Sequence, residues 1–176
     1  MRATDLLPGT AFGIAAGLLL GSSALDGGGQ GVKPVVAIRP YVAWSGAGSR
    51  IAEKSVLRIL TVEEWNEVWK KHAGEGSETP VVDFETCMVV AVFQGRGLNS
   101  DGVEAVSVEE EAGRILFRFD DRSYQTAGPG GGAVSVTAFG LFALRRSPKP
   151  LVVEEDVQSL IGKPPLWKER ARFDRL

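Results

Sequence analysis

One face of the segment 61–72 carries four apolar residues and a histidine at helical spacing, namely Val62, Trp65, Val68, Trp69 and His72. This period predicts an amphipathic helix whose apolar face is buried. Thr61 and Glu64 have the spacing of a capping box at the start of that helix. Gly74 follows the last turn in the position of a C-cap.

Alternating or continuously apolar segments around this helix predict β-strands. The segment 87–93 is apolar throughout, so we expect a central strand covered on both faces. Segments 103–109 and 114–119, joined by a short turn, predict a hairpin. Further strands are expected at 54–60, at 133–144 and, as an edge, at 151–153. This order predicts an α+β fold, mainly an antiparallel sheet with one amphipathic helix packed on it.

The chain begins with a segment typical of an export signal. Its apolar stretch, 11–20, ends in small residues, with Ser22 and Ala24 at the −3 and −1 positions of a signal-peptidase site. Residues 1–24 therefore predict a secreted or periplasmic protein of the cell envelope. Glycines recur every four residues from position 9 to position 21, which leaves open a short uncleaved membrane anchor. An N-terminal core helix is the third interpretation, and these glycines disfavour it.

The rest of the chain divides into three parts by composition. Residues 25–40 are rich in glycine and then proline, which indicates a linker. Residues 41–161 are expected to form a single α+β domain. Residues 162–176 form a basic tail, and the spacing of Leu166, Arg170 and Phe173 predicts a short amphipathic helix. That tail either docks on the acidic domain or binds an anionic partner or lipid surface.

Composition excludes several classes of function. The chain has one cysteine and one histidine, too few for a disulfide framework or for a zinc site built from such ligands. Its net charge of −2 gives no field for nucleic acid. The oxygen-bearing side chains at 99–101 and at Asp120 and Asp121 match no complete calcium loop. We therefore expect no cofactor, no metal and no nucleic-acid partner, and contact with a membrane only through an uncleaved N-terminal segment.

The order of motifs between residues 51 and 145 resembles the PrcB C-terminal-like domain family. The resemblance is carried by the tryptophan helix at 61–69, the stretch Pro-Val-Val-Asp-Phe at 80–84, and the apolar strand 88–93 closed by Gly95. This family is found mostly in exported bacterial proteins and is named after a subunit of a protease complex. It has no established catalytic residues, so the resemblance implies an accessory or binding role. At 98–103 this chain keeps one glycine of the family's turn and lacks its aromatic residue.

Two groups of residues are candidates for catalysis. Cys87 and His72 are the one cysteine and the one histidine, and such a pair needs the two side chains within hydrogen-bond reach. A pair of carboxylates is the other option, because two acids suffice to cleave a glycoside. The acids in question are Asp83, Glu85, Asp101, Glu104, Asp120 and Asp121. A small hydrolase is therefore the alternative hypothesis.

Binding is the leading hypothesis, and it rests on two loops. A long glycine loop precedes the strand at 133–144, and a polar turn follows the strand at 87–93. Loops placed on a rigid scaffold are common binding surfaces. The residues expected to contact a partner are Tyr124, Gln125, Thr126, Gly128, Gly130, Asn99 and Asp101. The sequence thus predicts a non-catalytic exported module that binds another envelope protein, as an accessory part of a protease or other complex.

Overall fold

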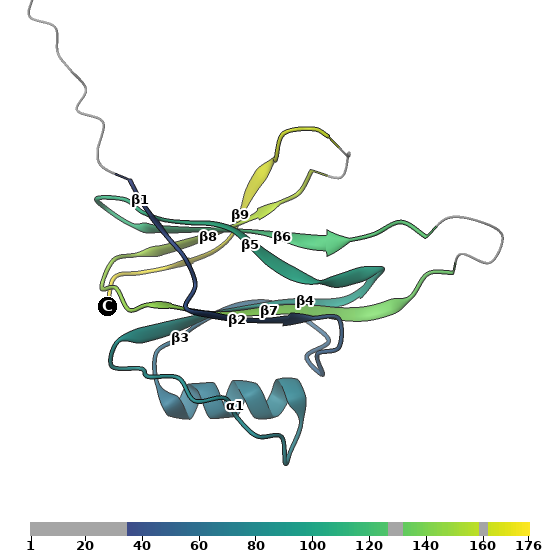
Figure 1. Ribbon diagram of the computed structural model, residues 1–176, viewed down its shortest axis with the longest axis horizontal. Coiled ribbons are helices and arrows are strands. Elements are labelled where there is room, and N and C mark those ends of the chain that lie inside the picture. Colours follow the sequence, from purple (N-terminus) through teal and green to yellow (C-terminus); the bar gives the residue numbers. More distant parts are fainter. Residues whose placement is uncertain (1–34, 127–131, 159–161) are drawn as a thin grey trace, which may run out of the picture. The chain divides into compact units, whose positions relative to one another are not determined.

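The computed structural model describes residues 35–126, 132–158 and 162–176. Within these ranges lie nine strands and one helix, which form two sheets and a helical layer (Figure 1). Sheet A contains, in spatial order, β1 (Val36–Ile38), β5 (Ser100–Glu110), β6 (Ile115–Ser123), β8 (Leu151–Asp156) and β9 (Trp167–Phe173). Sheet B contains β2 (Val42–Gly46), β7 (Ser135–Arg145), β4 (Cys87–Leu98) and β3 (Lys54–Ile59). The helix α1 spans Val62–Ala73. The predicted export signal, residues 1–24, lies outside the described residues.

The fold is mostly antiparallel sheet with one short helix, which agrees with the predicted fold class. The expected β5–β6 hairpin is confirmed, with Glu110 opposite Ile115. The strands nevertheless belong to two facing sheets, whereas the sequence predicted one sheet. In addition, β6 and β8 pair in parallel. Strand periodicity identifies which face of each strand is buried, and it does not specify which strands become neighbours.

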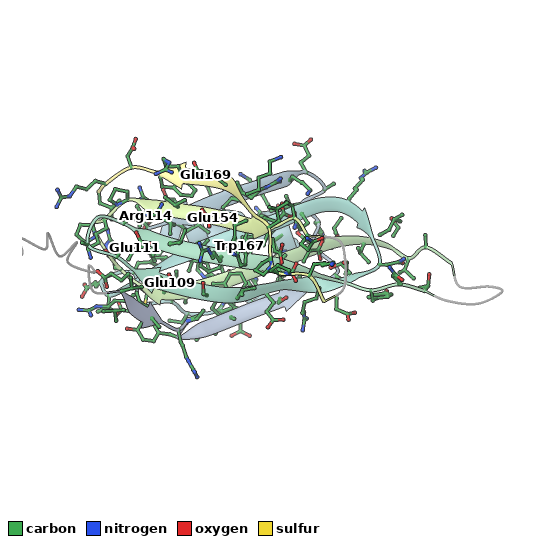
Figure 2. The ribbon with its side chains drawn as sticks, turned by 90° about the horizontal axis from the view of Figure 1, so that it is seen from above. Glu109, Glu111, Arg114, Glu154, Trp167 and Glu169 are labelled. Atoms are coloured by element: carbon green, nitrogen blue, oxygen red, sulfur yellow. The ribbon has the colours of Figure 1, made fainter. Side chains whose placement is uncertain are left out.

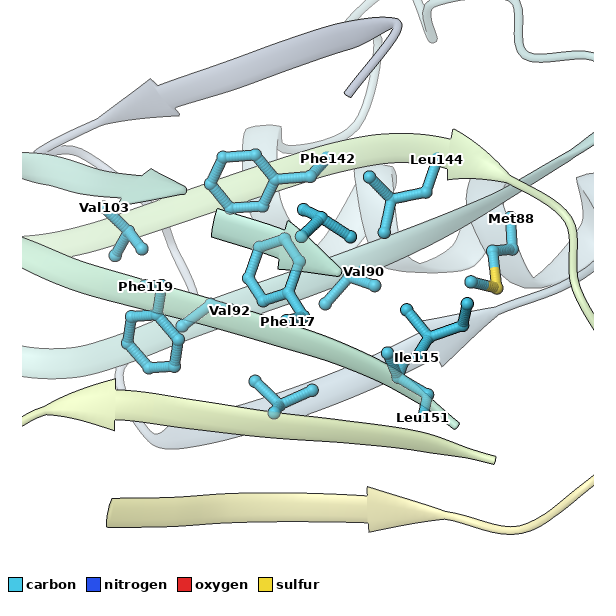
Figure 3. Close-up of a cluster of buried hydrophobic side chains, with 12 residues drawn as sticks. Met88, Val90, Val92, Val103, Ile115, Phe117, Phe119, Phe142, Leu144 and Leu151 are labelled. Atoms are coloured by element: carbon cyan, nitrogen blue, oxygen red, sulfur yellow. The ribbon is translucent and has the colours of Figure 1, made fainter. Parts of the chain in front are cut away.

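Alternate residues of β4 enter two hydrophobic cores. The core between the sheets holds Met88, Val90 and Val92 with side chains of β5, β6, β7 and β8 (Figure 3). The core between sheet B and α1 holds Val89, Ala91 and Phe93. The predicted central strand, covered on both faces, is therefore confirmed. Phe117 of sheet A and Phe142 of sheet B meet across the first core with 5.1 Å between their ring centroids.

The helix α1 begins and ends as the sequence predicts. Thr61 Oγ1 accepts the Glu64 N–H (3.2 Å), while Glu64 Oε2 accepts the Leu60 N–H (2.8 Å). Gly74 closes the helix with a φ of 102°, a conformation that favours glycine. Trp65 and His72 are buried against sheet B, whereas Val62 of the predicted apolar face is exposed.

The C-terminal tail is a strand, so the predicted amphipathic helix is wrong. Residues 167–173 pair with β8 as an antiparallel strand. Ala171 and Phe173 pack on the core between the sheets, and Trp167 and Glu169 lie on the other face of sheet A (Figure 2). The side chains of this segment thus alternate between the two faces of the sheet, with a period of two residues, and an irregularity near Arg170 interrupts the alternation. The tail docks on the domain, where Arg170 Nη1 lies 3.2 Å from Glu155 Oε2.

Sheet A extends the domain beyond the predicted bounds of 41–161. Strand β1 lies inside the expected linker 25–40 and pairs with β5, while β9 lies inside the expected tail. Residues 151–153 are not an edge, because β8 continues to Asp156 and lies between β6 and β9. The remaining linker residues, 25–34, lie outside the described part of the chain.

Candidate functional site

Asn99 joins three segments at one end of the two sheets. It occupies the turn between β4 and β5 with a φ of 54°, in the left-handed region that asparagine tolerates better than most residues. Its N–H donates to the Val134 carbonyl (2.9 Å), and its Oδ1 accepts the Val134 N–H (2.7 Å). Its carbonyl accepts the Tyr124 N–H (2.8 Å). Asn99 therefore fixes the end of β6 and the approach to β7 against the β4–β5 turn.

Three apolar side chains are exposed around Asn99. Leu98, Tyr124 and Val134 have 59%, 38% and 49% of their surfaces accessible. We call these three residues and Asn99 the tip surface. Leu98 precedes Asn99 in the chain, and Tyr124 and Val134 are bonded to it, so the three residues are neighbours. Patches of exposed apolar side chains often mark interaction sites. Sequence reasoning identified Asn99 and Tyr124, and it missed Leu98 and Val134, which directly flank the two predicted loops.

The other predicted binding residues lie beside the tip surface or outside the described residues. Arg122 Nη2 donates to the Asp101 carbonyl (3.1 Å), which ties the start of β5 to the end of β6. Gln125 and Thr126 are exposed and follow Tyr124 directly. Gly128 and Gly130 lie outside the described residues. The structure thus brings Asn99, Asp101 and Tyr124 to one end of the molecule.

A groove that sequence reasoning missed begins beside Arg122. It has a volume of about 480 Å³ and lies between β2 and β5. Its lining includes Ala43 and Ser45 of β2, residues 103–108 of β5, and Phe142 of β7. Arg39 and Arg122 are exposed and also line it. Because Arg122 also binds the Asp101 carbonyl, the groove and the tip surface adjoin.

Cys87 and His72 lie far apart along β4. Cys87 is the first residue of the strand and pairs with Arg145, while the His72 ring contacts Phe93 with 5.8 Å between centroids. Six residues of extended strand span about 20 Å. The two side chains are therefore too far apart to form a catalytic dyad.

His72 instead binds a serine inside the fold. Its Nδ1 lies 2.9 Å from Ser49 Oγ, and both residues are only 6% exposed. Ser49 Oγ also accepts the Ile51 N–H (3.0 Å). Burial lowers the pKa of His72, since imidazolium is poorly solvated there. The ring lies among Trp69, Phe93 and Phe139. A serine so enclosed is inaccessible to a substrate, so the pair is structural.

The lowered pKa of His72 predicts an acid-sensitive stability. In the unfolded chain this histidine takes up a proton below about pH 6.5, whereas in the folded protein it does so only at lower pH. The free energy of unfolding should therefore fall as the pH drops through about 6.5, and level off below the folded-state pKa. Urea denaturation at a series of pH values should show this slope in the wild type and lose it in His72→Gln. Equal slopes for the two proteins would contradict the assignment.

Among the carboxylates considered as an acid pair, Glu104 of β5 lies directly opposite Asp120 of β6, on the same face of sheet A. The charge of Glu104 contributes to the raised pKa of Asp120. Asp83 accepts the Thr86 hydroxyl (2.7 Å) and the Glu85 N–H (3.0 Å), and these bonds lower its pKa. Asp120 and Asp121 are consecutive on β6, so their side chains point to opposite faces of sheet A.

Burial is the main cause of a raised pKa at both Asp120 and Asp121. Asp156 raises the pKa of Asp120 further by charge repulsion. Asp121 accepts the Ser100 hydroxyl, which opposes the effect of its burial, and Glu155 adds repulsion. Glu155 in turn accepts Gln94 Nε2 at 2.5 Å. Asp121 and Glu155 are thus held by hydrogen bonds inside the fold, whereas Asp120 and Glu104 remain two carboxylates that face one another.

The outer face of sheet A carries arginines that are already bound by carboxylates. Arg114 makes two bonds to Glu111 (2.8 and 3.2 Å). Arg118 Nε donates to Glu154 (2.9 Å), and its guanidinium lies 5.1 Å from the centre of the Trp167 ring. Figure 2 shows this layer of charges over the sheet. Leu116 and Val152 are buried beneath it. This pattern is typical of a solvated sheet face whose charges are paired within the fold.

The described residues thus define an α+β protein of two facing sheets and one helix, with an exposed apolar surface at one end. Comparisons of the chain with protein-family models, with curated proteins and with solved structures found no match. The helix in the described part of the chain is too short and too polar to cross a membrane. Those same residues contain no group of three histidine, cysteine or acidic side chains placed to hold a metal ion.

Proposed function

We propose that the protein is an exported, non-catalytic module that binds another protein of the cell envelope. The export signal predicted at residues 1–24 supports this location. The resemblance to the PrcB C-terminal-like family supports an accessory role in a protease or other envelope complex. The tip surface is the part of the molecule to which we assign binding.

The fixed geometry around Asn99 is the observation that carries this proposal. Binding is weakened when loops and side chains must be ordered as the complex forms. Here two backbone hydrogen bonds and one bond to the Asn99 side chain hold Tyr124 and Val134 in place before any partner arrives. Tyrosine offers a large apolar ring and a hydroxyl with few rotatable bonds, so it is frequent at protein interfaces.

The alternative of a small hydrolase has weaker support. The distance between Cys87 and His72 removes the thiol dyad, and Ser49 is enclosed beside His72. Asp120 and Asp121 point to opposite faces of sheet A. The support that remains for a hydrolase is the pair formed by Asp120 and Glu104, which lie opposite one another on β6 and β5. A binding surface, by contrast, needs only exposed and ordered side chains, which the tip surface supplies.

Affinity capture with paired tyrosine variants tests the proposal. The chain has two tyrosines, and both Tyr41 and Tyr124 are exposed. Using the protein as bait in an extract of its native envelope, we expect Tyr124→Ala to reduce recovery of the partner by at least about tenfold, as for an interface hot spot. Tyr41 lies away from the tip surface, so Tyr41→Ala should leave recovery of the partner unchanged. An equal loss with both variants, or no reproducible partner, would refute the assignment.

A further inference from the structure

Sheet A and sheet B have their edge strands side by side on two sides of the domain, and the contacts between the sheets differ on these two sides. On one side, Arg58 of β3 lies over the Phe173 ring (5.4 Å) and donates from Nη1 to the Asp174 carbonyl (2.7 Å). This contact connects sheet B to the end of β9. On the other side, between β2 and β5, the sheets enclose the groove of about 480 Å³. Ligand sites commonly have volumes of about 300–1,000 Å³.

Most of the β5 edge in this groove has no strand beside it. Strand β1 pairs only with Val108, Glu109 and Glu110 and ends at Ile38, two residues before Pro40. Proline has no N–H to donate, so it cannot continue the ladder. Further along β5, Ser45 Oγ donates to the Val103 carbonyl (2.7 Å). In the described part of the chain, residues 104–107 therefore have a strand partner on the β6 side alone.

The groove combines an apolar lining with positive charge. Its walls include Ala43, Ala105 and Phe142, with exposed Val106 beside them. Arg39 and Arg122 are both exposed at the groove, and neither forms an ion pair with the described residues. Glu104 is the one acidic side chain among the residues that line it. The site thus fits an extended chain with small apolar residues and at least one carboxylate.

We propose that this groove binds an extended, acidic segment of a partner protein as an added antiparallel strand on β5. This inference rests on the proposed function, that the protein binds another polypeptide, and it names the form of the bound segment. Residues 104–107 offer about 13 Å of strand edge, with an irregularity between Ala105 and Ser107. Because alternate residues direct their N–H and C=O groups to the same side, about two residues of this stretch are available for main-chain bonds. Main-chain bonds supply affinity in such complexes, and pockets for alternate side chains supply specificity.

β1 indicates the direction of the added strand. It runs antiparallel to β5, with Val36 opposite Glu110 and Ile38 opposite Val108. A segment continuing in the same line would pass residues 107 to 104 and end near Arg122. We therefore expect its acidic residue toward its C-terminal end, where Arg122 can bind the carboxylate.

Selection from a display library of random short peptides tests this inference on the whole protein. We expect enrichment of β-forming peptides with an acidic residue near the C-terminal end. Ala43→Phe places a ring in the groove from an exposed position and should weaken the selected peptides by at least about tenfold. Arg122→Glu should weaken acidic peptides and spare their amide analogues. Arg145→Glu, an exposed arginine of another cavity, is the matched control and should have no effect.

Three outcomes would overturn the inference. No enrichment over the Ala43→Phe protein would exclude a peptide site, and so would peptides that bind both proteins equally. A wild-type dimer that Ala43→Phe converts to a monomer would make a second copy the occupant.

The Tyr124→Ala variant separates this inference from the proposed function. If peptide binding depends on the groove while Tyr124→Ala leaves recovery of the partner unchanged, the groove is supported as a binding site and the tip surface is rejected.

Discussion

Trp65→Ala is expected to lower the free energy of unfolding by about 3–5 kcal/mol, the usual cost of removing a large buried aromatic side chain. Trp65 is only 1% exposed and fills the space between α1 and sheet B. Its ring centroid lies 5.6 Å from that of Trp44 and 5.3 Å from that of Trp69. Its Nε1 also donates to the Pro80 carbonyl (2.8 Å), so the variant loses a partly buried hydrogen bond as well.

Urea denaturation followed by circular dichroism measures this effect, and Val62→Ala is the matched control. Val62 lies on the same helix and is 49% exposed. Its replacement should change the free energy of unfolding by less than about 1 kcal/mol, as for most surface positions. If the two variants were equally stable, the packing of α1 on sheet B through Trp65 would be wrong.

Gly102→Ala should destabilise the protein by about 3 kcal/mol, from backbone strain and a steric clash together. Gly102 has a φ of 123°, which side-chain-bearing residues rarely adopt. A Cβ atom at this position would lie 2.6 Å from the backbone nitrogen of Gly46 and 2.5 Å from Ser45 Oγ. β5 would have to move away from β2, at the place where the groove meets the tip surface.

Gly97→Ala is the control for this substitution. Gly97 lies in β4, its φ is not positive, and a Cβ there would meet nothing within 4 Å. Alanine in place of a strand glycine should be neutral, or stabilising by up to about 1 kcal/mol. Thermal and urea denaturation of both variants check the prediction. Equal stability of Gly102→Ala and the wild type would show that β5 and β2 do not approach as closely as described.

The parts of the fold that local chemistry determines could be predicted from the sequence. Thr61, Glu64 and Gly74 carry the signals for both ends of α1, and the structure contains those caps. The apolar run at 87–93 predicted burial on both faces of β4, and two cores surround it. In each case the signal lies within a few residues of the structure that it specifies.

The parts that depend on distant residues could not be predicted. The Ser49–His72 bond joins residues separated by 23 positions, and no motif relates them. The tail was assigned the wrong period because its strand contains an irregularity at Arg170. The loops of the candidate site were identified from their composition, whereas their attachment depends on Asn99 bonding Tyr124 and Val134 across three segments. The groove requires knowing that β1 stops at Ile38, before Pro40, while β5 continues.

The position of β8 and β9 has a consequence for the order in which the protein folds during synthesis. All strands of sheet B, together with α1, lie between residues 42 and 145, so this layer can assemble as soon as that length has left the ribosome. Sheet A is completed later. β6 has β5 on one side but lacks its second neighbour, β8, until residues 151–156 emerge, and β8 lacks β9 until residues 167–173 follow. During that interval β6 presents an unpaired edge, the kind of surface that promotes aggregation of nascent chains. Sheet A is therefore completed after all strands of sheet B have been made.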